Sequence, residues 1–403
     1  MHLTIFGGIT GFDKTEFIKS FTLQCFRKYG YPQDLYDEDS KRFIHYIKFE
    51  DELLAETEAV SVADFLAKPS FPEKIKSIEK TYLRIGRQIE DNEAEHVFLD
   101  IHLSCLYQSQ FFPPIYSANL RELDPLNEAT VKVVTLIDDV FVIWQKLRER
   151  EDLYPNTSLR LREILAWRSV ELLQAEAVAF HYTTEERPAR NYLFAIRHPF
   201  DSLHNLLFNK DPIGLYLSYP ITRTRNIHER VQDINNFRKS MYDMGRELEV
   251  VILDPVTIDE LALTSAPLEC EFRVLSEKNR WPLETELLVS EPDWPINIPE
   301  VEVEEARRDI SNNIRQRDFK LIDQSIFTTV YRKNFGGSSK GVIEEIRYTN
   351  SSGKRAYVYD PLEDGNGGVP HPFDQDEIGS RTVEEFYDRI RKGIDYYKTK
   401  RQK

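Results

Sequence analysis

A short loop of small residues, followed by two glutamates, carries the side chains best suited to chemistry. The loop at 334–341 reads Asn-Phe-Gly-Gly-Ser-Ser-Lys-Gly, and Glu344 and Glu345 follow it. Its glycines permit tight turns and let the backbone approach a ligand closely. A carboxylate in such a place can act as a nucleophile, an acid or a base. Acidic residues also suit the dipole of a first helical turn, so a purely structural role is the alternative for both glutamates.

The elements that position this loop form a strand–loop–helix–strand unit. A run rich in β-branched and aromatic residues at 327–331 predicts a strand before the loop. A helix is expected to begin at about Val342, with both glutamates in its first turn, and to end near Gly353, before a second strand at 356–359. Open α/β sheets bind ligands at the carboxyl ends of their strands, which is where this loop would lie.

The pattern S-x-x-G-V-x-x-E-I-x-Y after a strand, followed by G-K-x-x-Y-V-Y, resembles the nucleoside 2-deoxyribosyltransferase family and its N-glycosidase relatives. The resemblance implies a flavodoxin-like α/β fold and cleavage of the bond between a nucleobase and a (deoxy)ribose. The nucleophile of that family is a Glu at the start of this helix, and Glu345 matches it. Such a carboxylate traps the oxocarbenium-like sugar as a covalent intermediate, which water or a second base then resolves.

The same resemblance assigns roles to the predicted strand at 215–219. A Tyr on the opening strand helps to position the nucleophile in the family; Tyr216 fits that place, with Tyr219 as the alternative. A core or rim aromatic is the structural interpretation of both. Ser218 is expected to contact a 5′-phosphate, as in the nucleotide-hydrolysing branch of the family.

An acidic residue near the end of a predicted helix at 301–317 completes the implied site. The family uses an Asp in this region to bind the sugar or to protonate the leaving base, and Asp318 is a nearer match than Asp323. The chain departs from the family at Ile326, where relatives often have an Asp. The loop supplies the other candidate substrate contacts, which are Ser338, Ser339 and Gly341.

A second glycine loop matches a phosphate-binding pattern at all fixed positions but one. Read from Gly8 the string is G-x-x-x-x-D-K-T, in which Asp13 replaces the second glycine of G-x-x-x-x-G-K-[ST]. Lys14 would neutralise the phosphates of ATP or GTP, and Thr15 would help to hold Mg²⁺. A carboxylate beside a triphosphate is unfavourable unless a metal or Lys lies between them. The alternative is a degenerate loop kept for packing.

An apolar strand that ends in Asp100 supports a P-loop fold, because such an Asp helps to hold Mg²⁺. Strands alternate with helices over 1–205, which predicts a doubly wound parallel sheet. This half resembles, more loosely, the P-loop kinase group. The candidate nucleotide-binding residues are Gly8, Gly11, Asp13, Lys14, Thr15 and Asp100, with Thr15 and Asp100 as the metal ligands.

The alternation of strands and helices restarts after 209–212, so we expect two doubly wound α/β domains, 1–209 and 211–403. Residues 262–300 have no clear period and are interpreted as an inserted loop that covers the second site, or as a structural excursion. The resemblances imply an N-terminal nucleotide-binding module that regulates a C-terminal enzyme. Its substrate would be a nucleoside, a nucleotide or an NAD-type dinucleotide, with hydrolysis favoured over transfer. The alternatives are a nucleoside or nucleotide kinase and a catalytically inactive nucleotide sensor.

Composition narrows the partners and the location. The chain has 403 residues and a formal net charge of −15, which makes nonspecific binding to duplex nucleic acid unfavourable. Its three scattered cysteines give neither a disulfide framework nor metal spacing, which is typical of a reducing, cytoplasmic compartment. No apolar run approaches the length of a membrane span. The family often completes its sites across subunits, so we expect a homo-oligomer.

Overall fold

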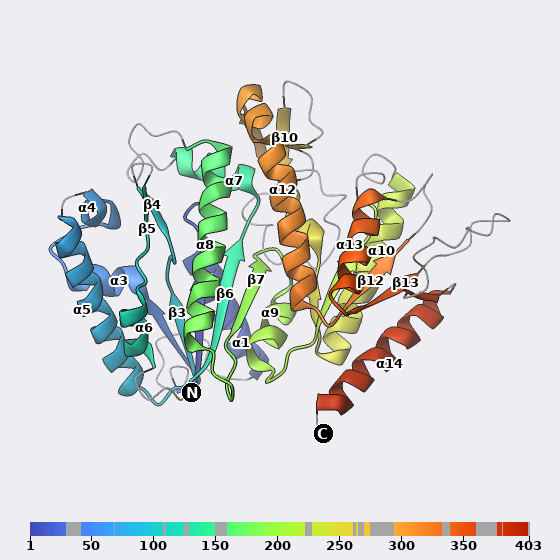
Figure 1. Cartoon of the computed structure of the whole chain (residues 1–403), viewed down its shortest axis with the longest axis horizontal. Helices are drawn as coiled ribbons and strands as arrows, with labels where there is room; N and C mark the ends of the chain where they lie inside the picture. The colour runs from blue at the N-terminus through green and yellow to red at the C-terminus, as the bar shows by residue number, and fades with distance from the viewer. Residues whose placement is uncertain are drawn as a thin grey trace. The chain divides into compact units, whose positions relative to one another are not determined.

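The computed structural model describes most of the chain, in these ranges: 1–29, 42–67, 69–107, 110–124, 129–149, 159–221, 228–260, 263–264, 270–274, 294–332, 339–359, 377–380 and 382–401. The chain divides into two compact units (Figure 1). Unit 1 comprises Met1–Ile196, Ala266–Phe272 and Pro295–Ile310, and unit 2 comprises Arg197–Ser265, Arg273–Trp294 and Ser311–Lys403.

Unit 1 is built on a five-stranded sheet in the order β2-β3-β1-β6-β7, and each neighbouring pair is parallel. The strands are β1 (His2–Gly7), β2 (Ile44–Lys48), β3 (His96–Asp100), β6 (Thr130–Ile137) and β7 (Arg190–Ala195). A separate antiparallel pair consists of β4 (Cys105–Tyr107) and β5 (Gln110–Phe112). The predicted parallel sheet is confirmed, and its central strand β1 leads directly into the glycine loop.

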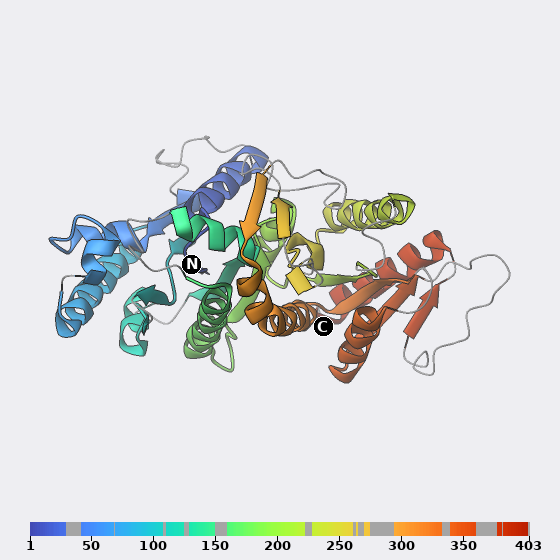
Figure 2. The same cartoon turned by 90° about the horizontal axis from the view of Figure 1, so that it is seen from above.

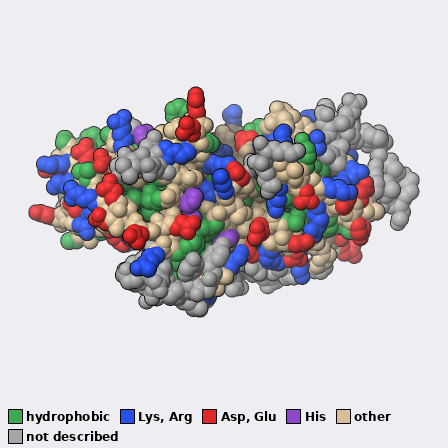
Figure 3. Space-filling model, turned by 90° about the horizontal axis from the view of Figure 1, so that it is seen from below, with side chains coloured by type: hydrophobic (Ala, Val, Ile, Leu, Met, Phe, Trp, Pro, Cys, Tyr) green, Lys and Arg blue, Asp and Glu red, His purple; other side chains and the backbone are tan. Residues whose placement is uncertain are grey.

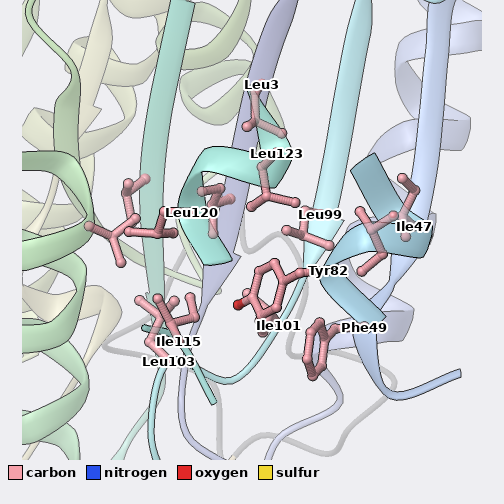
Figure 4. Close-up of a cluster of buried hydrophobic side chains, with 14 of the residues drawn as sticks. Leu3, Ile47, Phe49, Tyr82, Leu99, Ile101, Leu103, Ile115, Leu120 and Leu123 are labelled. Carbon is pink, nitrogen blue, oxygen red and sulfur yellow. The ribbon is translucent and has the colours of Figure 1, made fainter. Parts of the chain in front are cut away.

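Helices cover both faces of this sheet, with α1 on one side and α8 on the other (Figure 2). The helices are α1 (Lys14–Tyr29), α3 (Phe49–Ala55), α4 (Val62–Ala67), α5 (Phe71–Glu90), α6 (Ser117–Leu123), α7 (Val140–Glu149) and α8 (Leu161–Tyr182). Side chains alternate along β1, so Leu3 packs in the cluster that includes Tyr82 of α5 (Figure 4). Phe6 points to the opposite face, where it meets Phe98 edge to face.

Unit 2 is built on a second five-stranded sheet, in the order β14-β13-β12-β8-β9, and each neighbouring pair is again parallel. The strands are β8 (Gly214–Ser218), β9 (Val251–Leu253), β12 (Phe327–Tyr331), β13 (Arg355–Tyr359) and β14 (Glu377–Ser380). The chain winds outward from β8 to β9 and then returns past β8 to β12. The direction of winding therefore reverses between β8 and β12.

Helices cover both faces of this sheet, and successive side chains of each strand point alternately to one face and to the other. They are α9 (Phe200–Phe208), α10 (His228–Leu248), α13 (Lys340–Ser351), α14 (Val383–Arg401) and the longer α12 (Glu300–Gln324), whose first residues belong to unit 1. Phe327 and Tyr357 pack with apolar residues of α10 and α14. Val330 and Val358 point the other way and pack against α13.

Several boundaries differ from the sequence predictions. Helix α12 extends to Gln324 instead of ending near 317, so Asp318 and Asp323 lie within it. Helix α9 contacts β9 and α10 and belongs to unit 2, whereas the predicted boundary at 209–211 places it in the first domain. Within 262–300, β10 (Cys270–Val274) pairs with β11 (Trp294–Ile298), and 275–293 lie outside the described residues. No helix in the described ranges is long and apolar enough to cross a membrane.

Candidate functional site

The carboxylate of Glu345 lies at the carboxyl end of β8, held by two hydroxyl groups of that strand. The Tyr216 hydroxyl donates to Oε1 at 3.1 Å, and the Ser218 hydroxyl donates to Oε2 at 2.5 Å. Tyr216 and Ser218 are two residues apart, so both point to the face of the sheet that α13 covers. The structure thus brings together three of the predicted site residues, at the point where the winding of the sheet reverses.

Asp318 reaches the same site from α12, where a buried arginine holds it. Arg317 donates to Asp318 Oδ1 from Nε at 3.0 Å and from Nη2 at 2.9 Å. Its third nitrogen, Nη1, donates to the carbonyl oxygen of Ile258 at 2.8 Å and lies 4.0 Å from a carboxylate oxygen of Glu260. Arg317, Asp318 and Glu260 are all buried. Asp318 and Arg317 therefore bring one negative and one positive charge near Glu345, and Glu260 lies beside the guanidinium.

Burial and, after it, the charge of the neighbouring Asp318 carboxylate raise the pKa of Glu345 to about 8. The hydrogen bonds from Ser218 and Tyr216 and the charge of Arg317 act against this rise. Burial also raises the pKa of Asp318, against the opposing effect of Arg317. Because the charge of one carboxylate disfavours ionisation of the other, the pair keeps one proton below about pH 8.

The position of Glu345 in its helix corrects the sequence analysis. Helix α13 begins at Lys340, not at about Val342, so Glu345 stands in its second turn. The stabilising effect of a helix N-terminus on a negative charge fades within the first turn. Burial and Asp318 outweigh it, and the pKa of Glu345 rises where the dipole alone would lower it.

Sequence alone allows a structural role for either glutamate at the start of the helix. In the structure, the two side chains have different environments. Glu344 is exposed and pairs with Arg315 on the helix surface at 2.9 Å. Glu345 points inward to the hydroxyl groups of β8. Only Glu345 is thus placed for chemistry.

Tyr219 lies elsewhere, on the opposite face of the sheet. Its hydroxyl donates to the buried carboxylate of Asp254, which also accepts from Arg238 Nε at 2.7 Å and from the Tyr242 hydroxyl at 2.6 Å. Asp254 Oδ1 accepts from the amide of Val256 as well, so it caps the turn that follows β9. Between the two candidate tyrosines, the structure brings Tyr216 and not Tyr219 to Glu345.

The other predicted substrate contacts have local structural roles in the described residues. Asp323 accepts from the hydroxyl of Tyr348 at 2.9 Å on the outer surface of α12 and α13. Ser339 is the residue before the first turn of α13, and its carbonyl oxygen accepts from Ile343 at 3.1 Å. Gly341 is in that first turn, and Ser338 lies outside the described residues.

Sequence reasoning missed Arg317 and Glu260 as members of the site. Adjacent residues of a helix do not normally face each other, so an Arg-Asp pair gives no reason to expect a contact. Glu260 follows β9 and is distant from Arg317 in the chain, so only the fold brings them together. No sequence signal pointed to Glu260.

The N-terminal loop of unit 1 gathers the predicted phosphate-binding side chains into a closed set of contacts. Lys14 Nζ pairs with Asp100 Oδ1 at 2.8 Å and donates to the carbonyl oxygen of Ile101 at 2.5 Å. Asp100 Oδ2 accepts from the Thr15 hydroxyl at 2.8 Å and from the Tyr46 hydroxyl at 2.9 Å. Thr15 and Asp100 are thus adjacent oxygen donors, as a Mg²⁺ site requires.

Backbone groups of this loop are occupied by carboxylates of the chain itself. The amide of Gly8 donates to the buried carboxylate of Glu171 at 2.7 Å, and the amides of Leu103 and Ser104 donate to the same carboxylate. Asp13 Oδ1 accepts from the amide of Glu16 at 3.0 Å and so caps α1. These amides are of the kind that a phosphate would use at a helix N-terminus. A phosphate can therefore bind these amides only after the carboxylates of Glu171 and Asp13 have released them.

The left-handed backbone of this loop suits its glycines. Gly8 has a φ of 142° and Gly11 a φ of 118°, a region that other residues rarely adopt. Among the described residues, no group of three or more His, Cys, Asp or Glu side chains could hold a metal ion.

No protein-family model matches the chain, and no curated protein matches it. The geometry of the two sites is therefore the main guide to the function of the protein.

Proposed function

We propose that unit 2 is an N-glycosidase of the nucleoside 2-deoxyribosyltransferase type, which cleaves the base–sugar bond of a nucleoside, a nucleotide or an NAD-type dinucleotide. The observation that carries the proposal is the partly buried Glu345 carboxyl, hydrogen-bonded to Tyr216 and Ser218. A further support is the strand order of its sheet, which counted from β8 is the 2-1-3-4-5 order of flavodoxin-like folds. Such folds bind ligands at the point where the winding reverses, and Glu345 lies there.

In the proposed reaction the Glu345 carboxylate forms a bond to the anomeric carbon while the carbon–nitrogen bond to the base breaks. Tyr216 and Ser218 orient the carboxylate and favour its ionised form, since both donate to it. Asp318, with its raised pKa, gives its proton to the departing nitrogen. In the second half of the reaction the Asp318 carboxylate takes a proton from water, which attacks the same carbon and releases Glu345.

The productive state of the pair has Glu345 ionised and Asp318 protonated. Arg317 donates two hydrogen bonds to Asp318 Oδ1 and thereby fixes its orientation. We propose hydrolysis over transfer, with water as the group that resolves the glycosyl-enzyme.

For unit 1 we propose a regulatory P-loop-like module. A nucleotide with Mg²⁺ would be held by Lys14, Thr15 and Asp100 once the loop amides are released from Asp13 and Glu171. The kinase alternative requires a loop that is open to phosphate, and the internal bonds count against it. The inactive-sensor alternative requires that the Glu345 site be incomplete.

The test is release of free base by the purified full chain from a panel of nucleosides, nucleotides and NAD, with and without Mg-ATP. Glu345→Gln is expected to lower the rate by about 10³-fold or more, as loss of a catalytic nucleophile does. Glu344→Gln is the matched control, because this neighbour is exposed and pairs only with Arg315 among the contacts described above; it should keep nearly full activity.

Equal rates in the two variants would contradict the glycosidase. Phosphate transfer that is lost in Lys14→Ala would instead support the kinase. Binding of a panel member without either reaction would support the sensor.

A further inference from the structure

A cavity of about 490 Å³ lies in unit 2, at the amino ends of β12 and β13. Phe327, Arg355 and Tyr357 contribute to it from the strands, and the last turns of α14 close it. Tyr216, Ser218 and Glu345 meet at the carboxyl end of β8, which is parallel to β12. The cavity and the proposed catalytic site are therefore at opposite ends of one sheet.

One stripe of α14 forms a wall of this cavity. The helix residues that line it are spaced three or four apart along one face, and they are Arg389, Lys392, Gly393, Tyr396, Tyr397 and Lys400. At Gly393 an added Cβ would meet the Tyr357 hydroxyl at 2.5 Å. The glycine thus lets the Tyr357 ring reach the helix, and the cavity is a built feature of the packing between α14 and β13.

The charge of the cavity is opposite to that of the chain. Its charged lining residues are all basic: Lys354, Arg355, Arg389, Lys392 and Lys400. The chain carries a net charge of −15. In the space-filling view from the underside of Figure 1, Lys and Arg are interspersed with Asp and Glu (Figure 3). The cavity differs from this mixed surface, because no carboxylate lines it.

Three of the five basic groups already have partners. Lys354 donates to the carbonyl oxygens of Ile322 and Asp323, while Arg389 and Lys392 pair with acidic residues one turn earlier in α14. Arg355 and Lys400 are exposed, and within the described part of the chain neither forms an ion pair. These two are available to an anion, and guanidinium and ammonium groups both bind phosphate well.

Tyrosines supply the other half of the lining chemistry. Tyr357, Tyr396 and Tyr397 border the cavity, and Tyr396 is 59% exposed, so its ring is open to a ligand. Aromatic rings stack on the flat face of a nucleobase. The volume lies within the range of small-molecule sites.

We infer that this cavity is a second ligand site that binds a phosphorylated nucleoside, with the phosphates on Arg355 and Lys400 and the base against Tyr396. The site takes no part in bond cleavage, and its existence does not depend on the reaction proposed for Glu345.

Calorimetric titration of the full chain tests this inference, in a Glu345→Gln background that prevents turnover at the other site. ADP is the probe. Adenosine and pyrophosphate are titrated separately, to measure the contributions of the nucleoside and of the phosphates to binding. The double variant Arg355→Ala/Lys400→Ala is expected to weaken ADP binding at least tenfold. Tyr396→Ala is expected to weaken ADP and adenosine but not pyrophosphate.

Lys239→Ala is the matched control, because it removes an exposed lysine of the same unit, on α10, outside the cavity; it should leave ADP affinity unchanged. If the double variant lowers the melting temperature but binds ADP as before, the basic residues only neutralise helix C-termini and the inference fails. It also fails if pyrophosphate binds as tightly as ADP, or if a single-stranded oligonucleotide binds more tightly than either.

Discussion

At the scale of single residues, Glu345 combines two opposing demands. A nucleophile must be ionised, yet burial and Asp318 raise the pKa of this carboxyl to about 8. Below that pH the free protein holds Glu345 mainly in its neutral form. Because the productive form of the pair carries one proton, base release is expected to decline above about pH 8, where that proton is lost.

The first prediction follows from this sign. The kcat/KM for base release should fall about tenfold per pH unit above about pH 8, because this parameter reports ionisations of the free enzyme and the pair loses its proton there. It should also fall at low pH, where both carboxyl groups are protonated. A pH–rate profile from about pH 4 to 10 measures both limbs, and a rate that keeps rising above pH 8 would contradict the roles assigned to Glu345 and Asp318.

The second prediction concerns the hydroxyl of Ser218. Its hydrogen bond favours the ionised form of Glu345, so Ser218→Ala should move the falling limb near pH 8 to higher pH. A hydrogen bond to a charged group contributes about 1.5–3 kcal/mol, which corresponds to a shift of about one to two pH units. Ser351→Ala, at an exposed serine of α13, is the control and should leave the limb in place.

At the scale of elements, the carboxylate of Asp254 connects α10 to the ends of β8 and β9. It accepts from Arg238, Tyr219 and Tyr242, and its side chain is fully buried. The ionised form is favoured, because the Arg238 charge and these hydrogen bonds lower its pKa against the opposing effect of burial. This cluster explains why Tyr219 belongs to the core and not to the Glu345 site.

The third prediction is that Asp254→Asn lowers the free energy of unfolding of unit 2 by about 3–5 kcal/mol, since it leaves the Arg238 guanidinium buried without a counter-charge. Denaturant unfolding followed by circular dichroism measures the change. Asp243→Asn breaks an exposed ion pair on α10, the helix that carries Arg238, and should have little effect on the free energy of unfolding. Similar losses in the two variants would mean that the buried pair contributes no more than a surface pair.

Elements with strong local signals could be predicted from sequence. Strand β12 matches its predicted range because β-branched and aromatic residues fill it and turn residues follow it. The long helix α5 was not predicted, although its capping box of Ser70 and Glu73 is visible in the sequence. Helix α12 extends beyond its predicted end because tertiary contacts of Arg317 and Asp318 fix its last turns, and periodicity does not report such contacts.

The candidate site was predictable only in part, for a related reason. The motif selects Glu345, but the choice between Tyr216 and Tyr219 depends on which face of β8 each occupies. The raised pKa of Glu345 depends on Asp318, whose proximity arises from the fold. Local sequence thus identifies the proposed nucleophile, and the groups that shift its pKa come from elements distant in the chain.

At the scale of the whole molecule, two parallel sheets each present a candidate site at the carboxyl ends of their strands. In unit 1 the loop is filled from within, by Asp13 at the start of α1 and by Glu171 at the Gly8 amide. A nucleotide must compete with both.

The fourth prediction is that Asp13→Gly raises the affinity for Mg-ATP at least tenfold, because it removes a negative charge and frees the Glu16 amide. Titration calorimetry of the full chain measures it. Adding Lys14→Ala to this variant should remove the gain, since Lys14 supplies the positive charge. Unchanged affinity in Asp13→Gly would indicate that Asp13 does not limit nucleotide binding.

The carboxylate of Glu171 has a consequence for the lifetime of the protein. Many ligand-binding folds gain much of their resistance to unfolding from the molecule they hold, so that their survival depends on its supply. Here the Glu171 side chain, buried in α8, accepts from the Gly8 amide of the loop and from the amides of Leu103 and Ser104 while no nucleotide is bound. Unit 1 should therefore already resist proteolysis in a cell that is short of nucleotide.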